Sequence, residues 1–364
     1  MQRSYGKAMA WLAERDPAAE VLRFGDTILR RAGLEARSNR LARAYARLGV
    51  REGDLVTVAL PNGIAFLEAC LAAWKLGATP NPVSARLPEL ERRAIVDLAK
   101  PALLVGAAPG RYGAHACVPE GFEPGPEDGD GPLPDRVSAH VRAMTSGGST
   151  GRPKLIVERS PALCDPEQAD SGMRPGGTIL TTGPLYHAGP FITTWNQILC
   201  GGRVILHERF DAEAALAAIE QYRVDWVLFV PTMMQRIWRL PEAVRERYDV
   251  SSLTRVMCTG APSPAWLKRA WIDWLGPERI YEAYGGSERI AGCMISGSEW
   301  LEHPGSVGKP PPTRRIEARR PDGTRCAPRE IGELYMLPEG GAGSTYYYVG
   351  AEALTDAAGW ETVG

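Results

Sequence analysis

Strand and helix patterns alternate through most of the chain, and this alternation constrains the fold more than any other feature. In the first third, the apolar run 55–60 ends at a Pro-Asn-Gly turn and is followed by an apolar helical pattern over 64–76. In the middle third, short runs of strand character occur at 178–181, 203–206, 226–229 and 255–258, and helical patterns occur at 212–221, 232–238 and 264–275. Such a strand, helix, strand rhythm is typical of mostly parallel sheets with helices on their faces.

We therefore predict an α/β fold with two mostly parallel sheet-and-helix subdomains, over residues 1–135 and 136–304. The segment 109–134 is rich in Gly, Pro, Glu and Asp, and this composition indicates a surface connection. After residue 304 no helix-length pattern appears, and strand patterns lie on both sides of a Pro-Asp-Gly turn at 321–323. Residues 305–364 are expected to form a small β-rich subdomain.

Charge and cysteine usage exclude several classes of function. The formal net charge is -1, so no overall field favours nucleic acid or anionic lipid. No apolar run reaches the roughly 20 residues that span a bilayer, and the N-terminus does not have the apolar core of a signal peptide. The seven cysteines are scattered and show no metal-binding or redox spacing. We expect a cytoplasmic protein with reduced thiols, without a nucleic-acid partner or a membrane span; the patterns leave homo-oligomerisation open.

The segment 144–154, Met-Thr-Ser-Gly-Gly-Ser-Thr-Gly-Arg-Pro-Lys, is the strongest local signal for chemistry. Its glycines let main-chain N–H groups converge on an anion, its hydroxyls add donors, and Lys154 adds a full positive charge. Apolar residues on both sides predict that the segment joins two strands. It is not the common nucleotide-triphosphate loop, in which Gly-Lys is followed by Ser or Thr. We interpret it as an anion cradle rather than a flexible surface loop.

This loop resembles the signature loop of the adenylate-forming superfamily, which includes acyl-CoA synthetases, luciferases and peptide-synthetase adenylation domains. Gly147 and Leu155 depart from the usual pattern, but neither change removes a charge. Further motifs of the superfamily follow in the same order, at 184–189, 260–262, 284–288, 332–334 and 359–360. The resemblance thus covers the whole chain, as the large N-terminal domain of such an enzyme. The segment 348–352 is most similar to bacterial bile-acid-type or fatty acyl-CoA ligases.

The resemblance implies ATP, Mg²⁺ and coenzyme A as cofactors. The catalytic residues would be His187, Ser287 and Glu288, with Ser287 on the α-phosphate and Glu288 as the ligand of Mg²⁺. The phosphates would be held by Thr145, Ser146, Gly147, Gly148, Ser149, Thr150, Gly151 and Lys154. The remaining nucleotide-binding residues would be Gly260, Ala261, Pro262, Glu282, Ala283, Tyr284 and Gly285. We expect the loop and the 284–288 corner to face each other across a single pocket.

The acyl group is harder to place from the sequence. The candidates for its pocket are Trp195, Phe229, Val230, Thr232, Met233 and Gly285. An aromatic and methionine lining suits an apolar acid, but core packing is a strong alternative for Phe229 and Val230. Taken alone, Tyr284 would be a core aromatic and Glu288 a solvated charge; their spacing favours function. No acidic residue stands near His187 to hold a substrate amine, which disfavours an α-amino acid.

The implied reaction is ATP-dependent activation of a small, apolar carboxylic acid to an acyl-adenylate with release of pyrophosphate, followed by thioester formation with coenzyme A. Two alternatives remain: an adenylation domain that loads a carrier protein, and a catalytically inactive nucleotide-binding module. A kinase-like ATPase is disfavoured by the missing Gly-Lys-Ser/Thr. The mobile C-terminal domain of this superfamily, with its catalytic lysine, is absent from this chain, so we expect impaired activity.

Overall fold

A four-stranded parallel sheet forms the first α/β unit of the computed structural model, which describes residues 1–147 and 153–363. The sheet order is β5-β4-β6-β7, with strands β4 (Leu55–Val58), β5 (Thr79–Pro82), β6 (Leu103–Val105) and β7 (Ala116–Val118). Its helices are α1 (Tyr5–Arg15), α2 (Arg31–Arg47), α3 (Ile64–Lys75) and α4 (Glu89–Ala99). The predicted surface connection 109–134 therefore contains one short strand, β7, that the composition did not indicate.

The second α/β unit is an eight-stranded sheet in the order β16-β15-β14-β13-β11-β12-β2-β3. Six neighbouring strands run parallel: β2 (Glu20–Phe24), β11 (Thr178–Thr181), β12 (Arg203–Leu206), β13 (Trp226–Phe229), β14 (Arg255–Cys258) and β15 (Ile280–Gly285). The antiparallel edges are β3 (Thr27–Arg30) and β16 (Gly292–Ser296). The mostly parallel α/β class is thereby confirmed. Since β2 and β3 come from the N-terminal third, this sheet crosses the predicted division at residue 135.

Six helices and a 3₁₀ turn belong to this second unit among the described residues. They are α5 (Ala188–Leu199), α6 (Ala212–Tyr222), α7 (Pro231–Trp238), α8 (Glu242–Arg245), α9 (Ala265–Leu275), the 3₁₀ turn Pro277–Arg279 and α10 (Gly297–Glu302). The middle-third strands lie where the sequence predicts them, whereas α5 was not predicted. In the part of the chain that the structure covers, no helix combines the length and apolarity that a membrane crossing requires.

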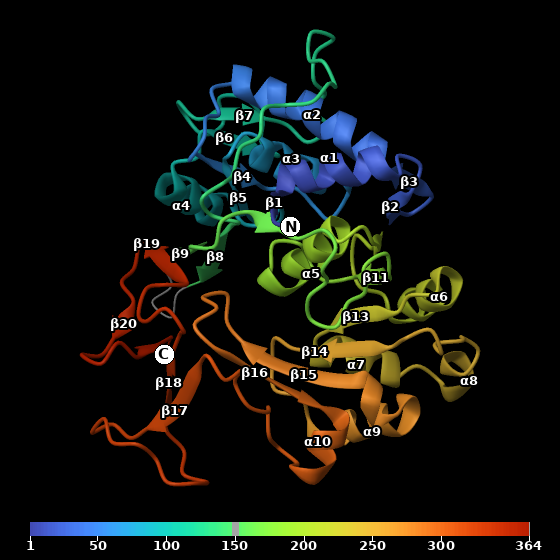
Figure 1. The fold of residues 1–364 in the computed structure, drawn as a ribbon, viewed down its shortest axis with the longest axis vertical. Coiled ribbons are helices and arrows are strands. Elements are labelled where there is room, and N and C mark those ends of the chain that lie inside the picture. Colours follow the sequence, from blue (N-terminus) through green and yellow to red (C-terminus); the bar gives the residue numbers. More distant parts are fainter. Residues whose placement is uncertain (148–152, 364) are drawn as a thin grey trace.

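Short antiparallel sheets complete the fold (Figure 1). One has the order β17-β18-β21-β20, from strands β17 (Arg315–Arg319), β18 (Glu333–Leu337), β20 (Leu354–Thr355) and β21 (Glu361–Thr362). Another joins β8 (Ala143–Gly147), β9 (Pro153–Glu158) and β19 (Tyr346–Val349), and β1 (Arg3–Ser4) pairs with β10 (Leu163–Cys164). The predicted β-rich region is confirmed, but its strand β19 leaves it to pair with β9.

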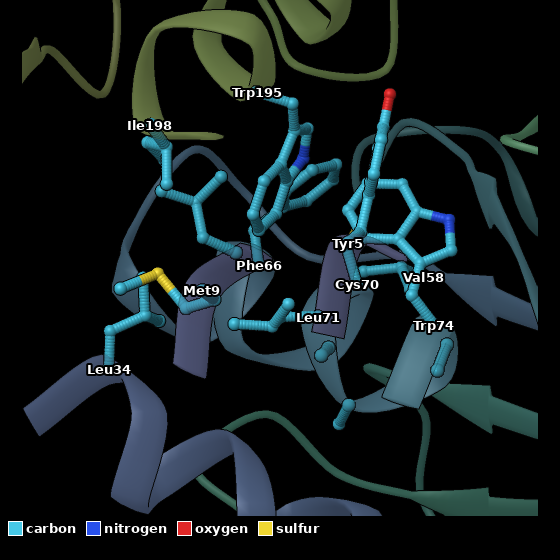
Figure 2. Close-up of a cluster of buried hydrophobic side chains, with 14 of the residues drawn as sticks. Tyr5, Met9, Leu34, Val58, Phe66, Cys70, Leu71, Trp74, Trp195 and Ile198 are labelled. Carbon is cyan, nitrogen blue, oxygen red and sulfur yellow. The ribbon is translucent and has the colours of Figure 1, made fainter. Parts of the chain in front are cut away.

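One hydrophobic core joins the two α/β units (Figure 2). At its centre the indole of Trp74 meets Trp195 edge to face, with ring centroids 4.7 Å apart, and Tyr5 in the same manner at 4.8 Å. These residues come from α3, α5 and α1, so helices of both units bury their aromatic rings together. The indole N–H of Trp74 donates to the carbonyl of Val141 at 2.9 Å. The core therefore also holds the chain just before β8, the first strand of the predicted phosphate loop.

Candidate active site

The predicted phosphate loop connects two antiparallel strands, as its flanking apolar residues indicate. In the β8–β9 hairpin, Ser146 is opposite Lys154 and Gly147 is opposite Pro153. The amide of Asn81 on β5 donates to the carbonyl of Ala143 at 2.8 Å and anchors the hairpin on the first sheet. The predicted residues Gly148, Ser149, Thr150 and Gly151 lie outside the described residues. The two ends of the loop are thus placed by regular pairing.

The second predicted motif, 284–288, lies at the turn between β15 and β16. Tyr284 and Gly285 end β15, and Gly285 is opposite Gly292 in the register. In the turn, Glu288 is buried with 8% of its surface exposed, and Ser287 is half-buried. A carboxylate in such a position requires polar partners, because its burial otherwise costs several kcal/mol.

The two motifs meet through the side chain of Tyr348 on β19. Its hydroxyl donates to Glu288 Oε1 at 2.8 Å, and the Nζ atom of Lys154 lies over its ring, 3.9 Å from the centroid. Lys154 and Glu288 are therefore one aromatic ring apart. Sequence reasoning missed Tyr348, and the signal available for it was the run of three tyrosines at 346–348.

The predicted adenine side of the site is a cavity of about 760 Å³. All seven residues predicted there line it: Gly260, Ala261, Pro262, Glu282, Ala283, Tyr284 and Gly285. Trp300 and Val307 add apolar surface, as do Ile316 and Leu334 of the β-rich region. Gly260 has a φ of +84°, and a Cβ there would lie 3.2 Å from Val230 Cγ1, so only glycine fits without strain.

A buried ion pair stands in the wall of this cavity. The carboxylate of Glu282 contacts the ammonium of Lys268, which comes from α9. Burial lowers the pKa of Lys268 to about 8, and its Nζ also lies 4.9 Å from the ring centroid of Trp300. Sequence reasoning predicted Glu282 but missed its partner, which lies 14 residues away in sequence.

A second cavity, of about 450 Å³, lies on the other side of the hairpin. It brings together Thr145 and Ser146 of β8 with His187, and residues of α4 such as Leu90 and Ile95 add apolar surface. Among the described residues, Thr145 and Ser146 of the loop line this cavity, whereas 282–285 line the larger one. Because residues 148–152 of the loop lie outside the described residues, the expectation of a single pocket stays a prediction.

His187 is held at the start of α5 by a fixed turn. The side chain of Asn62 donates to the carbonyl of Gly183 at 2.9 Å and accepts from the backbone N–H of Leu185 at 2.8 Å. The imidazole lies against the ring of Tyr186, with centroids 4.5 Å apart. Desolvation lowers the pKa of His187 below its ordinary 6.5, so the ring is neutral at neutral pH and can accept as well as donate.

Most of the candidates for the acyl pocket do not line either cavity. Trp195 and Phe229 have 1% and 0% of their surface exposed and pack in the cores of the two units. Val230 and Met233 are half-buried and Thr232 is exposed. Only Gly285 of this set lines one of the two cavities, on the adenine side. Trp195 and Phe229 are therefore core residues, as the alternative of core packing expects.

Comparison with known proteins agrees with this geometry. Residues 9–347 match the AMP-binding enzyme family. A feruloyl-CoA synthase from Amycolatopsis sp is 33% identical over 340 residues, which cover 89% of this chain and 68% of that protein. A luciferin 4-monooxygenase from Photuris pensylvanica is 26% identical over 344 residues, 82% of this chain and 61% of that protein.

Solved structures show the same fold. The o-succinylbenzoate CoA synthetase of Bacillus subtilis, in complex with its acyl-adenylate intermediate, matches with a TM-score of 0.80 and 22% identity over 100% of this chain and 75% of that one. The inhibitor-bound N-terminal domain of FACL13 from Mycobacterium tuberculosis matches with a TM-score of 0.75 and 19% identity over 99% of this chain and 98% of that one. With its motifs, fold and family match in agreement, the chain belongs to the AMP-binding enzyme family.

Proposed function

We propose that this protein uses ATP to convert a carboxylic acid into an acyl-adenylate, releases pyrophosphate, and passes the acyl group to coenzyme A. The single observation that carries the proposal is the corner formed by Lys154, Tyr348 and Glu288. It combines a cation and a carboxylate at the base of a loop rich in backbone and hydroxyl donors. Such a set fits a triphosphate and the divalent cation that accompanies it.

Glu288 is suited to hold Mg²⁺. The hydroxyl of Tyr348 donates to its Oε1 atom. Its Oε2 atom faces Gly286, and a Cβ added at Gly286 would lie 2.8 Å from this oxygen. No group of three or more His, Cys, Asp or Glu residues gathers as a metal site within 1–147 and 153–363. One carboxylate is enough for Mg²⁺, because this ion takes its other ligands from phosphate and water. When bound, it would withdraw charge from phosphate oxygens.

The residues of the chain itself supply binding and orientation. Lys154 and the hydroxyls of Thr145 and Ser146 would hold the phosphates, and the large cavity lined by Tyr284 would take the adenine. Negative charge builds on phosphate oxygens as the acid attacks, so fixed donors there stabilise the transition state more than the ground state. We assign the cavity at His187 to the carboxylic acid and coenzyme A, because this cavity reaches the loop from the side opposite the cavity lined by Tyr284.

A panel of carboxylic acids tests the proposal. Ferulate is included because the relative at 33% identity is a feruloyl-CoA synthase, and alkyl acids and α-amino acids complete the panel. The readouts are acid-dependent ATP–pyrophosphate exchange and the mass of any acyl-CoA formed. We expect exchange and acyl-CoA with at least one apolar acid, and both slowed by ~10²–10³ in Lys154→Ala.

The same panel separates the alternatives. Exchange without acyl-CoA, together with acyl transfer to a carrier protein, would favour a carrier-loading domain. ATP binding without exchange for any acid would favour an inactive nucleotide-binding module. Either result would contradict the proposed reaction with coenzyme A.

A further inference from the structure

We propose that Tyr348 is a positioning residue: it holds Lys154 and Glu288 in place for Mg²⁺ and the phosphates of ATP, and keeps the two charges from pairing with each other. The inference rests on the proposed function. It assigns a role to a strand, β19, that contains none of the site residues predicted from the sequence. The side chain touches both charged groups of the corner at once (Figure 1 shows β19 beside β9).

The register of the sheet explains why Tyr348 reaches Lys154. In the antiparallel β19–β9 pair, Tyr348 is opposite Ile156, and Lys154 lies two residues from Ile156 on the same face. Diagonal neighbours of this kind are within reach of aromatic and long side chains. A cation over a ring keeps its full charge, since the attraction arises from the ring quadrupole.

The hydroxyl of Tyr348 sets the direction of the Glu288 carboxylate. Its hydrogen bond of 2.8 Å ends on Oε1. A phenol is protonated at physiological pH and can donate this bond. A partner that orients a metal-binding carboxylate in this way contributes to metal affinity without touching the metal.

A separate contact docks the turn itself on β9. Arg289 follows Glu288 with a φ of +54°, and its guanidinium pairs with Glu158 at 2.8 Å. Glu158 also pairs with the buried Arg142 at 2.7 Å. The turn is therefore fastened to β9 independently of Tyr348. Loss of the phenol should change the direction of Glu288 and leave the position of the turn unchanged.

Two substitutions separate the hydroxyl from the ring. Tyr348→Phe keeps the ring under Lys154 and removes the bond to Glu288, whereas Tyr348→Leu removes both. Tyr347→Phe is the matched control, because Tyr347 neighbours Tyr348 on β19 but directs its hydroxyl to His140 at 3.4 Å. The measured quantities are the half-saturating Mg²⁺ concentration and the KM for ATP in acid-dependent pyrophosphate exchange, with the Tm of each variant.

We expect Tyr348→Phe to raise the half-saturating Mg²⁺ concentration by about tenfold, the lower end of the effect of losing a partner of a metal ligand. Its KM for ATP at saturating Mg²⁺ should stay near the wild-type value. In Tyr348→Leu both values should rise, since Lys154 is then free to pair with Glu288. Tyr347→Phe should match the wild type in both.

A Mg²⁺ requirement of Tyr348→Phe equal to that of Tyr347→Phe would overturn the inference. So would a uniform fall in kcat and Tm with unchanged Mg²⁺ and ATP dependence, because that pattern indicates a structural role only. If the wild type shows no acid-dependent exchange, the proposed function fails. Calorimetric titration of ATP at several Mg²⁺ concentrations then measures the same Tyr348 effects on binding alone, with the same two deciding results.

Discussion

Two lysine–glutamate sets border the candidate site, and they are arranged in opposite ways. Lys268 and Glu282 are both buried and contact each other directly in the wall of the larger cavity, which we propose for adenine. Lys154 and Glu288 instead each contact the side chain of Tyr348, which stands between them. In the first set each charge neutralises the other. In the second set, both charges remain available to bind phosphate and metal.

This difference shows why residue type alone does not reveal a role. A direct buried pair satisfies itself, and its loss leaves an uncompensated charge. A separated pair has no such internal partner, so its charges are available to phosphate and metal. We therefore expect substitutions in the first set to act on stability, and substitutions in the second to act on ATP chemistry.

The largest expected effect is on stability and comes from Lys268→Met. It leaves Glu282 buried without its cation, and breaking such a pair costs about 3–5 kcal/mol of unfolding free energy. Urea unfolding measures the loss, with the exposed Lys7→Met as control, which should change little. A Lys268→Met protein as stable as the control would show that Glu282 is paired by something other than Lys268.

Next in size is the effect of Lys154→Ala on the reaction. Loss of one fixed donor to the reacting phosphates should slow acid-dependent pyrophosphate exchange by ~10²–10³, equivalent to ~3–4 kcal/mol. The unfolding free energy should change little, because Lys154 is only half-buried. Lys7→Ala serves as the control for both measurements. If Lys154→Ala greatly lowers the unfolding free energy but leaves the exchange rate of the folded protein unchanged, Lys154 acts on stability. That result would contradict the contrast between the two sets.

The smallest expected effect concerns His187. Its lowered pKa means that the midpoint of its protonation, and of any loss of rate that follows from it, lies below pH 6.5. As pH falls through this lowered pKa, the wild-type exchange rate should decline. His187→Asn, which cannot take the proton, should lose this decline while running about tenfold slower at neutral pH, as expected for one lost hydrogen bond. Identical pH profiles would remove His187 from the reaction.

The sequence predicts much of the fold, and the reason is visible in the middle third. The segments 178–181 and 226–229 are short runs of β-branched, apolar and aromatic residues, so their length and composition locate them as strands. Helix α5 was not predicted although Phe191, Trp195 and Ile198 recur at helical spacing; its start follows the His187 motif and has no side-chain cap to mark it. The crossing of β2 and β3 into the second sheet has no local signal, because strand pairing is decided by tertiary contacts.

The site residues likewise divide into those that a local sequence pattern reveals and those that only tertiary contacts reveal. Motifs with fixed local spacing, such as 260–262 and 284–285, line one cavity together. Tyr348 and Lys268 were missed, since each acts through a partner distant in sequence. Trp195 was assigned to the acyl pocket on residue type, although its ring packs on Trp74 in the core. Aromatic residues fill both cores and pockets, so composition does not distinguish the two uses.

A double-mutant cycle between Lys154→Ala and Glu288→Ala tests the central claim most directly. The measured quantities are the affinity for ATP in saturating Mg²⁺ and the unfolding free energy. If both side chains act on one bound triphosphate, their effects on affinity should be non-additive by more than about 1 kcal/mol, while their effects on stability should add within about 0.5 kcal/mol. Additive effects on affinity together with coupling in stability would show a structural pair and contradict the account.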